Sequence, residues 1–188
     1  MARLLAEAPT AGLGLPISAG GATLSARDLG PVTSVAPFRG REGEVAARLG
    51  VAPPPPNGTA SWGEGRVLWT GPGRWLLVGV PAPGGLEGLA AVVDQTDASA
   101  CVLLDGPGAR DVLARLVPVD LRDRSLPVGA TARTVLNHMT VTLSRVGGAA
   151  WEVMALRSMA GTLVEEVERA MRGVVAREAP APARGSGA

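Results

Sequence analysis

Residues 66–77 constrain the fold more than any other part of this sequence, because they predict two strands joined by a tight turn. The centre of this stretch reads Gly71-Pro72-Gly73-Arg74. Proline suits the second position of a type II turn, and glycine suits the third, where φ must be positive. Valines and leucines surround one tryptophan on each side, which is typical of strands. Because Trp69 and Trp75 are two of only four tryptophans in the chain, we expect the core to be densest at this hairpin.

Composition excludes several classes of chemistry. At 188 residues the chain is long enough for one domain with a substantial core. All 18 basic residues are arginine, so Schiff-base catalysis and the lysine of a phosphate-binding P-loop are both excluded. One histidine, His138, and one cysteine, Cys101, are too few for the usual zinc sites.

Charge and hydropathy limit the kinds of partner and the cellular location that we expect. A net charge of +1 predicts no general attraction to nucleic acid or to an anionic membrane. No apolar run reaches the roughly 18 residues that a membrane-spanning helix needs. The first residues lack the basic and then apolar regions of a secretory signal. A single cysteine cannot form an internal disulfide, so we expect a cytoplasmic protein.

The elements predicted along the chain are those of an α+β fold. Strands are expected at residues 33–39, in the hairpin at 66–77, and at 97–105, 132–136, 139–144 and 151–155. Helices are expected at residues 42–49, 86–93 and 107–116, and from an N-cap at Ser158 to about Met171. This order predicts a mainly antiparallel sheet with helices packed on it.

Three regions are expected from the distribution of residue types. Residues 1–30, rich in Ala, Gly and Leu, predict an N-terminal arm that is irregular or ordered by a partner. Residues 31–175 predict a single α+β domain, and a division into two small subdomains near residues 57–61 is left open. Residues 176–188 are rich in Ala, Pro, Gly and Arg and predict a disordered tail.

Each residue that could carry chemistry also has a simpler structural explanation. The Gly106-Pro107-Gly108 segment lies between a predicted strand and a predicted helix, where phosphate could bind. It lacks the third glycine of the dinucleotide pattern, and Pro107 removes one donor, so a tight structural turn is the better explanation. His138 could be a general base, but an ordinary exposed or hydrogen-bonded histidine is expected. Cys101, in the middle of a strand, is expected to be a small buried apolar residue.

The charged and aromatic residues also predict structure before chemistry. Residues 120–124 read Asp-Leu-Arg-Asp-Arg and predict a solvated connection with local ion pairs rather than an acid–base pair. Trp62, Trp69, Trp75 and Trp151 could stack on a flat ligand such as a pterin, but packing in the core or against a partner is expected. No convincing catalytic set emerges, and a binding or assembly role is favoured.

Several segments, taken in order, resemble the gamma subunit of heterotetrameric sarcosine oxidase. Residues 68–77 are similar to that family's W-x-G-P-x-x-W-L-L hairpin, and residues 102–113 to its L-x-G-P-x-A-x-x-V-L strand–turn–helix. Residues 119–121 and 133–134 resemble its D-L … R-T segment, and residues 157–160 its R-S-F-A, with methionine in place of phenylalanine. The resemblance covers about residues 61–171. The residues that match its motifs are Trp69, Gly71, Pro72, Trp75, Gly106, Pro107, Asp120, Arg157 and Ser158.

The resemblance implies a fold similar to part of the folate-binding aminomethyltransferase fold and a non-catalytic structural or assembly subunit. The complex would oxidatively demethylate sarcosine to glycine, form hydrogen peroxide and pass the one-carbon unit to tetrahydrofolate. FAD, FMN, NAD and tetrahydrofolate are implied for the complex and no cofactor for this chain. The implied partners are the alpha, beta and delta subunits, and the isolated chain is expected to be inactive.

The alternative is a free-standing folate-binding protein or an aminomethyltransferase-like enzyme. Relatives of that kind use a hairpin with paired carboxylates near the folate. The comparable segment here, residues 136–141, has no carboxylate, which counts against folate catalysis by this chain. A folate binder without catalysis stays open.

Overall fold

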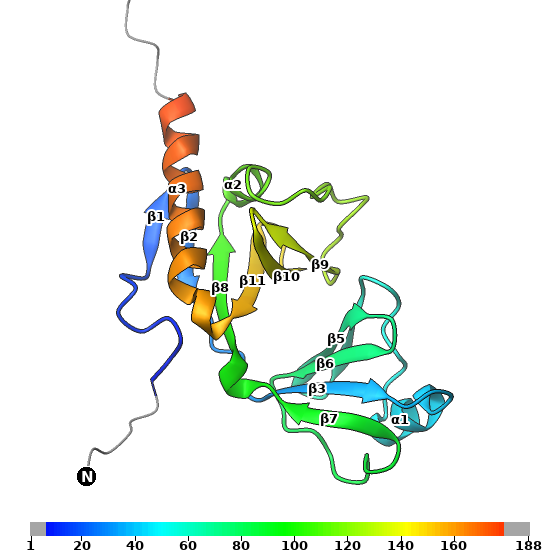
Figure 1. The fold of residues 1–188 in the computed structure, drawn as a ribbon. Helices are drawn as coiled ribbons and strands as arrows, with labels where there is room; N and C mark the ends of the chain where they lie inside the picture. The colour runs from blue at the N-terminus through cyan, green and yellow to red at the C-terminus, as the bar shows by residue number, and fades with distance from the viewer. Residues whose placement is uncertain (1–6, 179–188) are drawn as a thin grey trace, which may run out of the picture.

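The computed structural model describes residues 7–178 as two antiparallel sheets with helices lying against them (Figure 1). A six-stranded sheet has the order β1-β2-β8-β11-β10-β9, and a five-stranded sheet has the order β4-β5-β6-β3-β7. Every neighbouring pair of strands is antiparallel. The predicted α+β class with a mainly antiparallel arrangement is therefore confirmed.

In the sequence, all the strands of the five-stranded sheet lie between two strands of the six-stranded sheet, β2 and β8. The six-stranded sheet consists of β1 (Ile17–Ala19), β2 (Ala22–Ala26), β8 (Ser99–Asp105), β9 (Thr131–Leu136), β10 (Met139–Arg145) and β11 (Ala150–Leu156). The five-stranded sheet consists of β3 (Val32–Pro37), β4 (Thr59–Trp62), β5 (Gly65–Gly71), β6 (Arg74–Val78) and β7 (Ala90–Asp94). The helices are α1 (Glu42–Leu49), α2 (Ala109–Leu113) and α3 (Ala160–Glu178), with short 3₁₀ turns η1 (Thr96–Ala98) and η2 (Arg157–Met159). The chain therefore leaves the six-stranded sheet after β2 and returns to it as β8.

The N-terminal arm, predicted at residues 1–30 to be irregular or ordered by a partner, contains two strands within its described residues, 7–30. Strands β1 and β2 form a hairpin, and β2 pairs with the central strand β8. Leu24 of β2 is fully buried, and Ala22 is nearly so. The arm contains few residues that favour strands, and its order comes from pairing with β8, which lies far away in the sequence. Residues 1–6 of the predicted arm lie outside the described residues.

The helix predicted at residues 86–93 is wrong. Leu86, Leu89 and Ala90 share a helical spacing, but they make one turn, in which the N–H groups of Leu89 and Ala90 donate to the Leu86 carbonyl at 3.0 and 3.1 Å. Gly88 has a φ of 74° inside this turn, which a continuing helix does not allow. The following residues, including Val92 and Val93, then pair with β3 as strand β7, which suits β-branched side chains.

Several predicted boundaries differ from the observed elements: the strand expected from residue 97 begins at Ser99, and the helix expected at residues 107–116 spans Ala109–Leu113. The predicted division near residues 57–61 falls inside the part of the chain that builds the five-stranded sheet, between α1 and β5. Helix α3 runs to Glu178, so the first three residues of the predicted tail are helical. Residues 179–188 of that tail lie outside the described residues.

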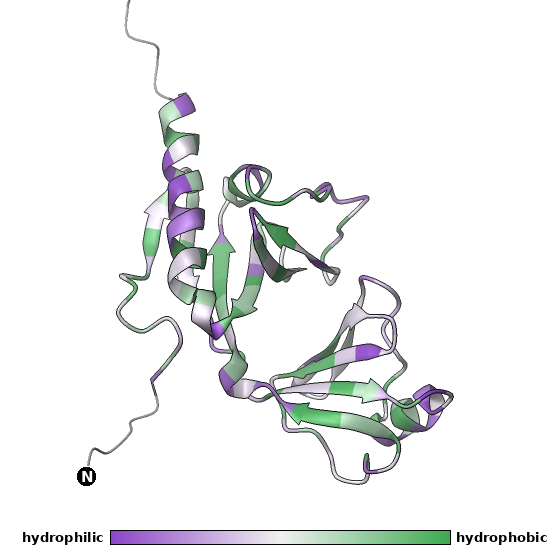
Figure 2. Cartoon of the chain, viewed as in Figure 1, coloured by the Kyte–Doolittle hydropathy of each residue, from purple (hydrophilic) through white to green (hydrophobic). Residues whose placement is uncertain are grey.

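The largest core cluster lies in the six-stranded sheet and not at the hairpin. It packs β2, β8, β10 and β11 against α2 and α3, and Trp151, Leu143 and Leu163 are at most 1% exposed within it. The hairpin contributes Trp75 to a smaller cluster beneath α1. In Figure 2, β8 is hydrophobic along most of its length, whereas α3 alternates between hydrophobic and hydrophilic residues. Helix α3, at 19 residues, supplies far more covering surface than the shorter helices, which explains where the main core formed.

The hairpin and the first helix agree with their predictions. Strands β5 and β6 meet at the Gly71-Pro72-Gly73-Arg74 turn, in which Gly73 has a φ of 60°. Helix α1 spans residues 42–49 as predicted and ends at Gly50, which takes the left-handed conformation at a φ of 68°. Among residues 7–178, no helix is long and apolar enough to cross a membrane.

Candidate interaction site

An open groove of about 640 Å³ lies between the tip of the β5–β6 hairpin and strand β9. Its lining includes Trp69, Thr70, Gly71, Pro72, Arg133, Thr134 and Val135. A backbone hydrogen bond of 2.9 Å from Thr131 to the Asn57 carbonyl holds β9 beside the start of β4. Two segments that lie far apart in the sequence, both matched to the same family, therefore form opposite walls of one groove.

The side chains of this groove suit binding better than catalysis. Trp69 is half-buried, whereas Arg133 is exposed and forms no ion pair within the part of the chain that the structure describes. The lining contains no carboxylate, histidine or cysteine, so it offers no general base that could activate its threonine hydroxyls as nucleophiles. An aromatic face, a guanidinium and an open shape are typical of a surface that contacts another protein.

Trp75 has a different environment from Trp69, although the two lie opposite each other in the hairpin. Trp75 is 4% exposed and packs in the cluster that includes Val45 and Leu49 of α1. Trp62 belongs to the rim of that cluster, and its indole Nε1 donates to the Leu49 carbonyl at 2.8 Å. The four tryptophans are thus divided between the core, its rim and the groove.

The Gly106-Pro107-Gly108 turn holds the N-terminal hairpin. The N–H of Gly108 donates to the Gly21 carbonyl at 3.0 Å. A Cβ at Gly108 would lie 1.8 Å from the carbonyl oxygen of Gly20, so a residue without a side chain is required here. The helix was predicted to begin at Pro107. Gly108 is instead the N-cap of α2, so Pro107 precedes the cap and is not helical. The structural explanation of this turn is supported by these contacts.

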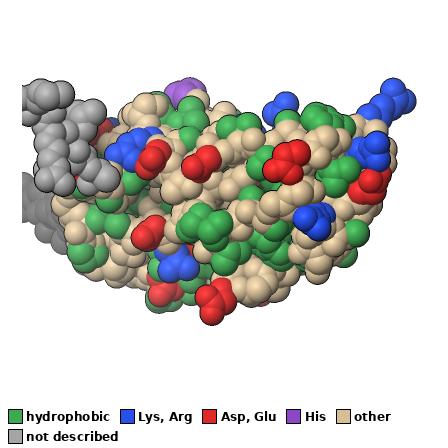
Figure 3. All heavy atoms as spheres, turned by 90° about the horizontal axis from the view of Figure 1, so that it is seen from below, with side chains coloured by type: hydrophobic (Ala, Val, Ile, Leu, Met, Phe, Trp, Pro, Cys, Tyr) green, Lys and Arg blue, Asp and Glu red, His purple; other side chains and the backbone are tan. Residues whose placement is uncertain are grey.

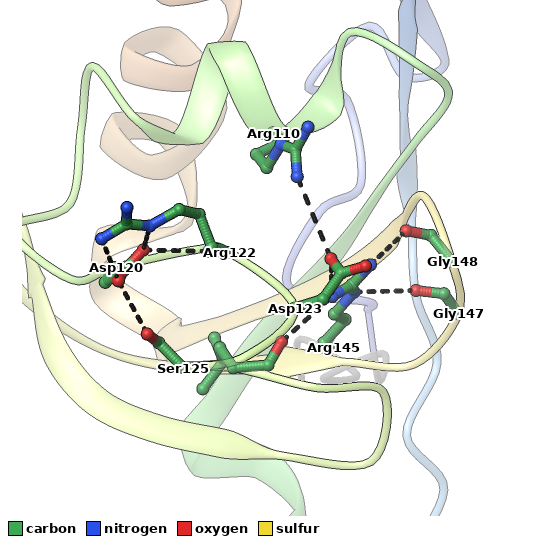
Figure 4. A network of polar contacts seen from close by, with 9 residues as sticks. Arg110, Asp120, Arg122, Asp123, Ser125, Arg145, Gly147 and Gly148 are labelled. Carbon is green, nitrogen blue, oxygen red and sulfur yellow. Dashed lines mark hydrogen bonds and ion pairs between the residues drawn. The ribbon is translucent and has the colours of Figure 1, made fainter.

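A buried arginine organises the adjoining surface, as Figure 4 shows. Arg145, at the end of β10, is 7% exposed. Its guanidinium donates to Asp123 Oδ1 at 2.8 Å and to the carbonyls of Leu126 and Gly148 at 3.1 and 2.8 Å. Its Cζ also lies 5.1 Å from the ring centroid of Trp151, a cation–π distance. The network fixes the loops at one end of the six-stranded sheet.

Two exposed carboxylates shape the connection between α2 and β9. Asp120 accepts hydrogen bonds from Nε and Nη2 of Arg122 at 2.8 and 2.7 Å, and from Ser125 Oγ at 2.7 Å. These bonds, that of Arg122 first, hold the pKa of Asp120 well below its usual range. The hydrogen bond from Arg145 likewise lowers the pKa of Asp123. The predicted local ion pair is therefore confirmed for Asp120 with Arg122, whereas Asp123 pairs with Arg145, which lies 22 residues away in the sequence.

A second buried charge joins the two sheets. Glu152 of β11 is 2% exposed. Its carboxylate accepts a hydrogen bond of 2.9 Å from Nε of Arg27, which follows β2, and one from Nη2 of Arg66 in β5. Because β11 and β5 belong to different sheets, this ion-pair cluster connects the two sheets directly.

Arg157 and Ser158 lie in η2, before the last helix. The guanidinium of Arg157 donates to the Glu7 carbonyl and lies 3.9 Å from the Asp97 carboxylate, so it ties the N-terminal segment to η1. Ser158 was predicted to be the N-cap of the last helix, and this prediction is wrong, because α3 begins at Ala160. Ser158 is exposed. Residues Arg157–Met159 form a 3₁₀ turn, which moves the first residue of the helix by one position from the prediction.

The remaining candidates for chemistry lie apart. His138 is exposed in the turn between β9 and β10, whereas Cys101 is buried in β8. Burial, and after it the charge of Glu152, raises the pKa of the Cys101 thiol, which opposes formation of a thiolate. Within residues 7–178, no group of three or more His, Cys, Asp or Glu residues could hold a metal ion.

Sequence reasoning missed Arg145 and Glu152, although one signal was available. Met139, Val141 and Leu143 alternate along β10, and Arg145 continues the same buried face. Glu152 lies between the buried residues Trp151 and Val153 and is on the opposite face of β11, which is also buried at this position. The residues matched to the family are divided among the groove, the cluster beneath α1, the glycine turn, the acidic connection and η2, and do not form one site.

Comparisons with known proteins identify the relatives of this chain. A sarcosine oxidase subunit gamma of Arthrobacter sp. is 35% identical over 121 residues, which cover 58% of this chain and 59% of that protein. The protein of the same name from Corynebacterium sp. (strain U-96) is 33% identical over 96 residues, 47% of each chain. The matched region thus spans three fifths or less of these curated relatives. No protein-family model matches the chain.

A solved structure extends the likeness to nearly the whole chain. It is a chain of the heterotetrameric sarcosine oxidase from Corynebacterium sp. U-96, determined in complex with pyrrole 2-carboxylate. The two chains are 25% identical, with a TM-score of 0.81 over 94% of this chain and 100% of that one. In sequence, this chain is therefore similar to proteins named sarcosine oxidase subunit gamma, and in fold it matches a chain of a heterotetrameric sarcosine oxidase.

Proposed function

We propose that this chain is the gamma subunit of a heterotetrameric sarcosine oxidase and that it serves in assembly instead of catalysis. One observation carries the proposal: the fold matches a complete chain of such an enzyme, at a TM-score of 0.81 over 94% of the present chain. The sequence similarity to curated gamma subunits supports the same assignment independently.

The complex as a whole is proposed to oxidise sarcosine to glycine, reduce oxygen to hydrogen peroxide and pass the one-carbon unit to tetrahydrofolate. Alpha, beta and delta subunits are the proposed partners, and they would hold FAD, FMN, NAD and tetrahydrofolate. We assign no cofactor to the present chain and expect it to be inactive alone. A cytoplasmic location belongs to the same proposal, because the one cysteine, Cys101, is a buried free thiol that fits a reducing compartment.

The groove at the hairpin tip is the proposed contact surface for a partner subunit. The residues matched to the family at this place, Trp69, Gly71 and Pro72, present an aromatic ring beside a rigid turn. Aromatic side chains and arginines are enriched in protein interfaces, and Arg133 lies on the opposite wall. The other matched residues, Trp75, Gly106, Pro107, Asp120, Arg157 and Ser158, are proposed to be structural.

Co-purification tests the proposed function. A tagged copy of this chain is expressed together with alpha, beta and delta subunits of a sarcosine oxidase, and the purified material is examined for flavin absorbance and for sarcosine-dependent hydrogen peroxide. We expect a stoichiometric flavoprotein complex that forms peroxide and an isolated chain that does not. A stable monomer that captures no flavoprotein would overturn the proposal.

A folate-binding protein without catalysis is the second candidate, and Trp69 at the wall of the groove is the observation that favours it. If a pterin ring stacked there, the tryptophan fluorescence of the isolated chain would change saturably during titration with tetrahydrofolate. Trp69→Phe, which keeps an aromatic face, should then retain affinity, whereas Trp69→Ala should lose it. The absence of any saturable change up to millimolar ligand would exclude this candidate.

A further inference from the structure

Strand β7 forms one border of the five-stranded sheet and is exposed along nearly its whole length. After the buried Ala90, each of the next four residues, Ala91 to Asp94, is exposed. Val92 is 41% exposed and Val93 51%, and Phe38, whose N–H donates to the carbonyl of Leu89 just before β7, is 49% exposed. Figure 3 looks onto the lower side of Figure 1, where β7 lies, and shows hydrophobic side chains between acidic ones on this face.

The backbone of β7 has free hydrogen-bonding groups along its outer edge. The N–H of Phe38 donates to the Leu89 carbonyl at 2.8 Å, and the N–H of Gln95 donates to the Val32 carbonyl at 2.8 Å. In an antiparallel pair, alternate residues turn both backbone groups toward the partner strand. Leu89, Ala91, Val93 and Gln95 therefore face β3, and Ala90, Val92 and Asp94 face outward. Within residues 7–178, the N–H and the carbonyl of Val92 have no backbone partner.

Along its apolar centre, Ala91 to Val93, this edge has none of the devices that usually protect an exposed strand, and its one charged residue, Asp94, stands at the end of the strand. Natural edge strands are blunted by lysine, proline, bulges or a covering element. Between residues 90 and 94, β7 has no basic residue and no proline, its register with β3 is regular, and no described element covers it. An apolar edge left open in this way is a template for another extended segment.

We propose that the outer edge of β7 binds an extended, apolar segment of another subunit of the complex, which adds a sixth strand to this sheet. The inference rests on the proposed function. The charges beside the edge indicate which residues the bound segment should contain. Asp94 and Asp97 are exposed at one end of the edge, and Glu87 is exposed just before its other end. A segment with an apolar centre and arginine or lysine at its ends complements this edge. Main-chain hydrogen bonds provide affinity, and the flanking charges set the register.

The variant Val92→Pro can test binding at the edge without disturbing the pairing of β7 with β3. The Val92 N–H points outward, so Val92→Pro removes no hydrogen bond to β3, and proline is tolerated on the open side of an edge strand. Val92→Thr keeps the N–H and a β-branched side chain. Ser61→Pro is the matched control, because Ser61 is exposed on β4 at the opposite border of the same sheet. The N–H of Trp69 donates to the Gly58 carbonyl, so the same alternation turns the Ser61 N–H outward.

Co-expression of each variant with the other three subunits tests the proposal, with capture of flavoprotein measured per mole of folded chain. We expect Val92→Pro to lower capture roughly tenfold or more, as for the loss of interfacial backbone hydrogen bonds. Val92→Thr and Ser61→Pro should stay within about twofold of wild type, since both keep the β7 edge. Circular dichroism and the melting temperature confirm that the variants are folded, and Val93→Arg supplies a second edge variant if Val92→Pro does not fold.

The outcomes separate this proposal from the proposed function. If the Val92→Pro variant captures as much flavoprotein as the wild type, the proposed role of the edge is overturned and the proposed function stays intact. A wild-type chain that captures no flavoprotein would overturn both. A homodimer of the isolated chain that Val92→Pro dissociates would assign the edge to a second copy, and it would overturn the proposal of another subunit.

Discussion

The two sheets of this chain differ in how completely they are covered. The six-stranded sheet packs under α2 and the 19-residue α3, and it holds the largest buried cluster. The five-stranded sheet has the eight-residue α1, two smaller clusters and an open apolar edge at β7. The better-covered sheet therefore supplies most of the stability, and the other leaves surface available for binding.

The same contrast appears in the buried charges. Arg145 fixes loops within the six-stranded layer, whereas Glu152 joins that layer to the other through Arg66. Buried ions are strongly destabilising when one partner is lost, so each cluster holds its surroundings in one arrangement. The molecule thus combines a rigid connection between the sheets with an uncovered outer sheet, which suits a subunit that positions other proteins.

The largest effect on stability is expected from Glu152→Ala, which breaks the connection between the sheets. The change leaves Arg66 without its carboxylate partner, and loss of one member of a buried ion pair costs about 3 to 5 kcal/mol. Urea denaturation followed by circular dichroism measures the free energy of unfolding. Glu168→Ala, which removes a surface ion pair with Arg172, is the control and should cost less than about 1 kcal/mol. Equal costs for the two variants would contradict the joining role of Glu152.

Trp75→Ala tests how far the five-stranded sheet depends on its smaller core. Trp75 is 4% exposed beneath α1, and truncation of a buried tryptophan costs about 3 to 5 kcal/mol. We expect about 3 kcal/mol, because a cluster near the surface can collapse partly around the cavity. Trp69→Ala, its half-buried neighbour across the hairpin, should cost about 1 kcal/mol. A loss for Trp69→Ala as large as that for Trp75→Ala would show that both rings are core residues.

A smaller, pH-dependent effect is expected from Asp123→Asn. The folded-state pKa of Asp123 lies below its ordinary value of 3.8, so its ionised form stabilises the fold above that value. This stabilisation is lost as the pH falls through the lower, folded-state pKa. The melting temperatures of wild type and variant should therefore differ at about pH 6, and the difference should shrink as the pH falls below 3.8. Asp111→Asn, at another exposed carboxylate of the same surface, is the control. A difference that persists unchanged in acid would contradict the ion pair with Arg145.

Local signals predicted the elements whose stability is local. Proline and glycine predicted the hairpin turn, and local spacing predicted the helix at residues 42–49 and the strand that forms most of β8. The glycine turn before α2 was also predicted as structural, although the sequence could not show that Gly20 and Gly21 pack against it.

The elements that were missed depend on partners far away in the sequence. Strands β1 and β2 are ordered by β8, and β7 is ordered by β3, so short-range periodicity indicated neither. Arg145 and Glu152 were missed because their charge suggested solvent, whereas the alternation of their strands places them in the interior. The groove at β9 arises from the juxtaposition of the two sheets, which no single segment predicts.

The most direct test of the assembly role separates assembly from turnover in the complete complex. Complexes are purified with wild-type chain and with Trp69→Ala, and two quantities are measured: the yield of assembled complex and sarcosine-dependent hydrogen peroxide per bound flavin. If the chain contributes surface and no chemistry, Trp69→Ala lowers the yield and leaves turnover per flavin unchanged. Full assembly with lost turnover per flavin would contradict this, and it would place Trp69 in the chemistry of the enzyme.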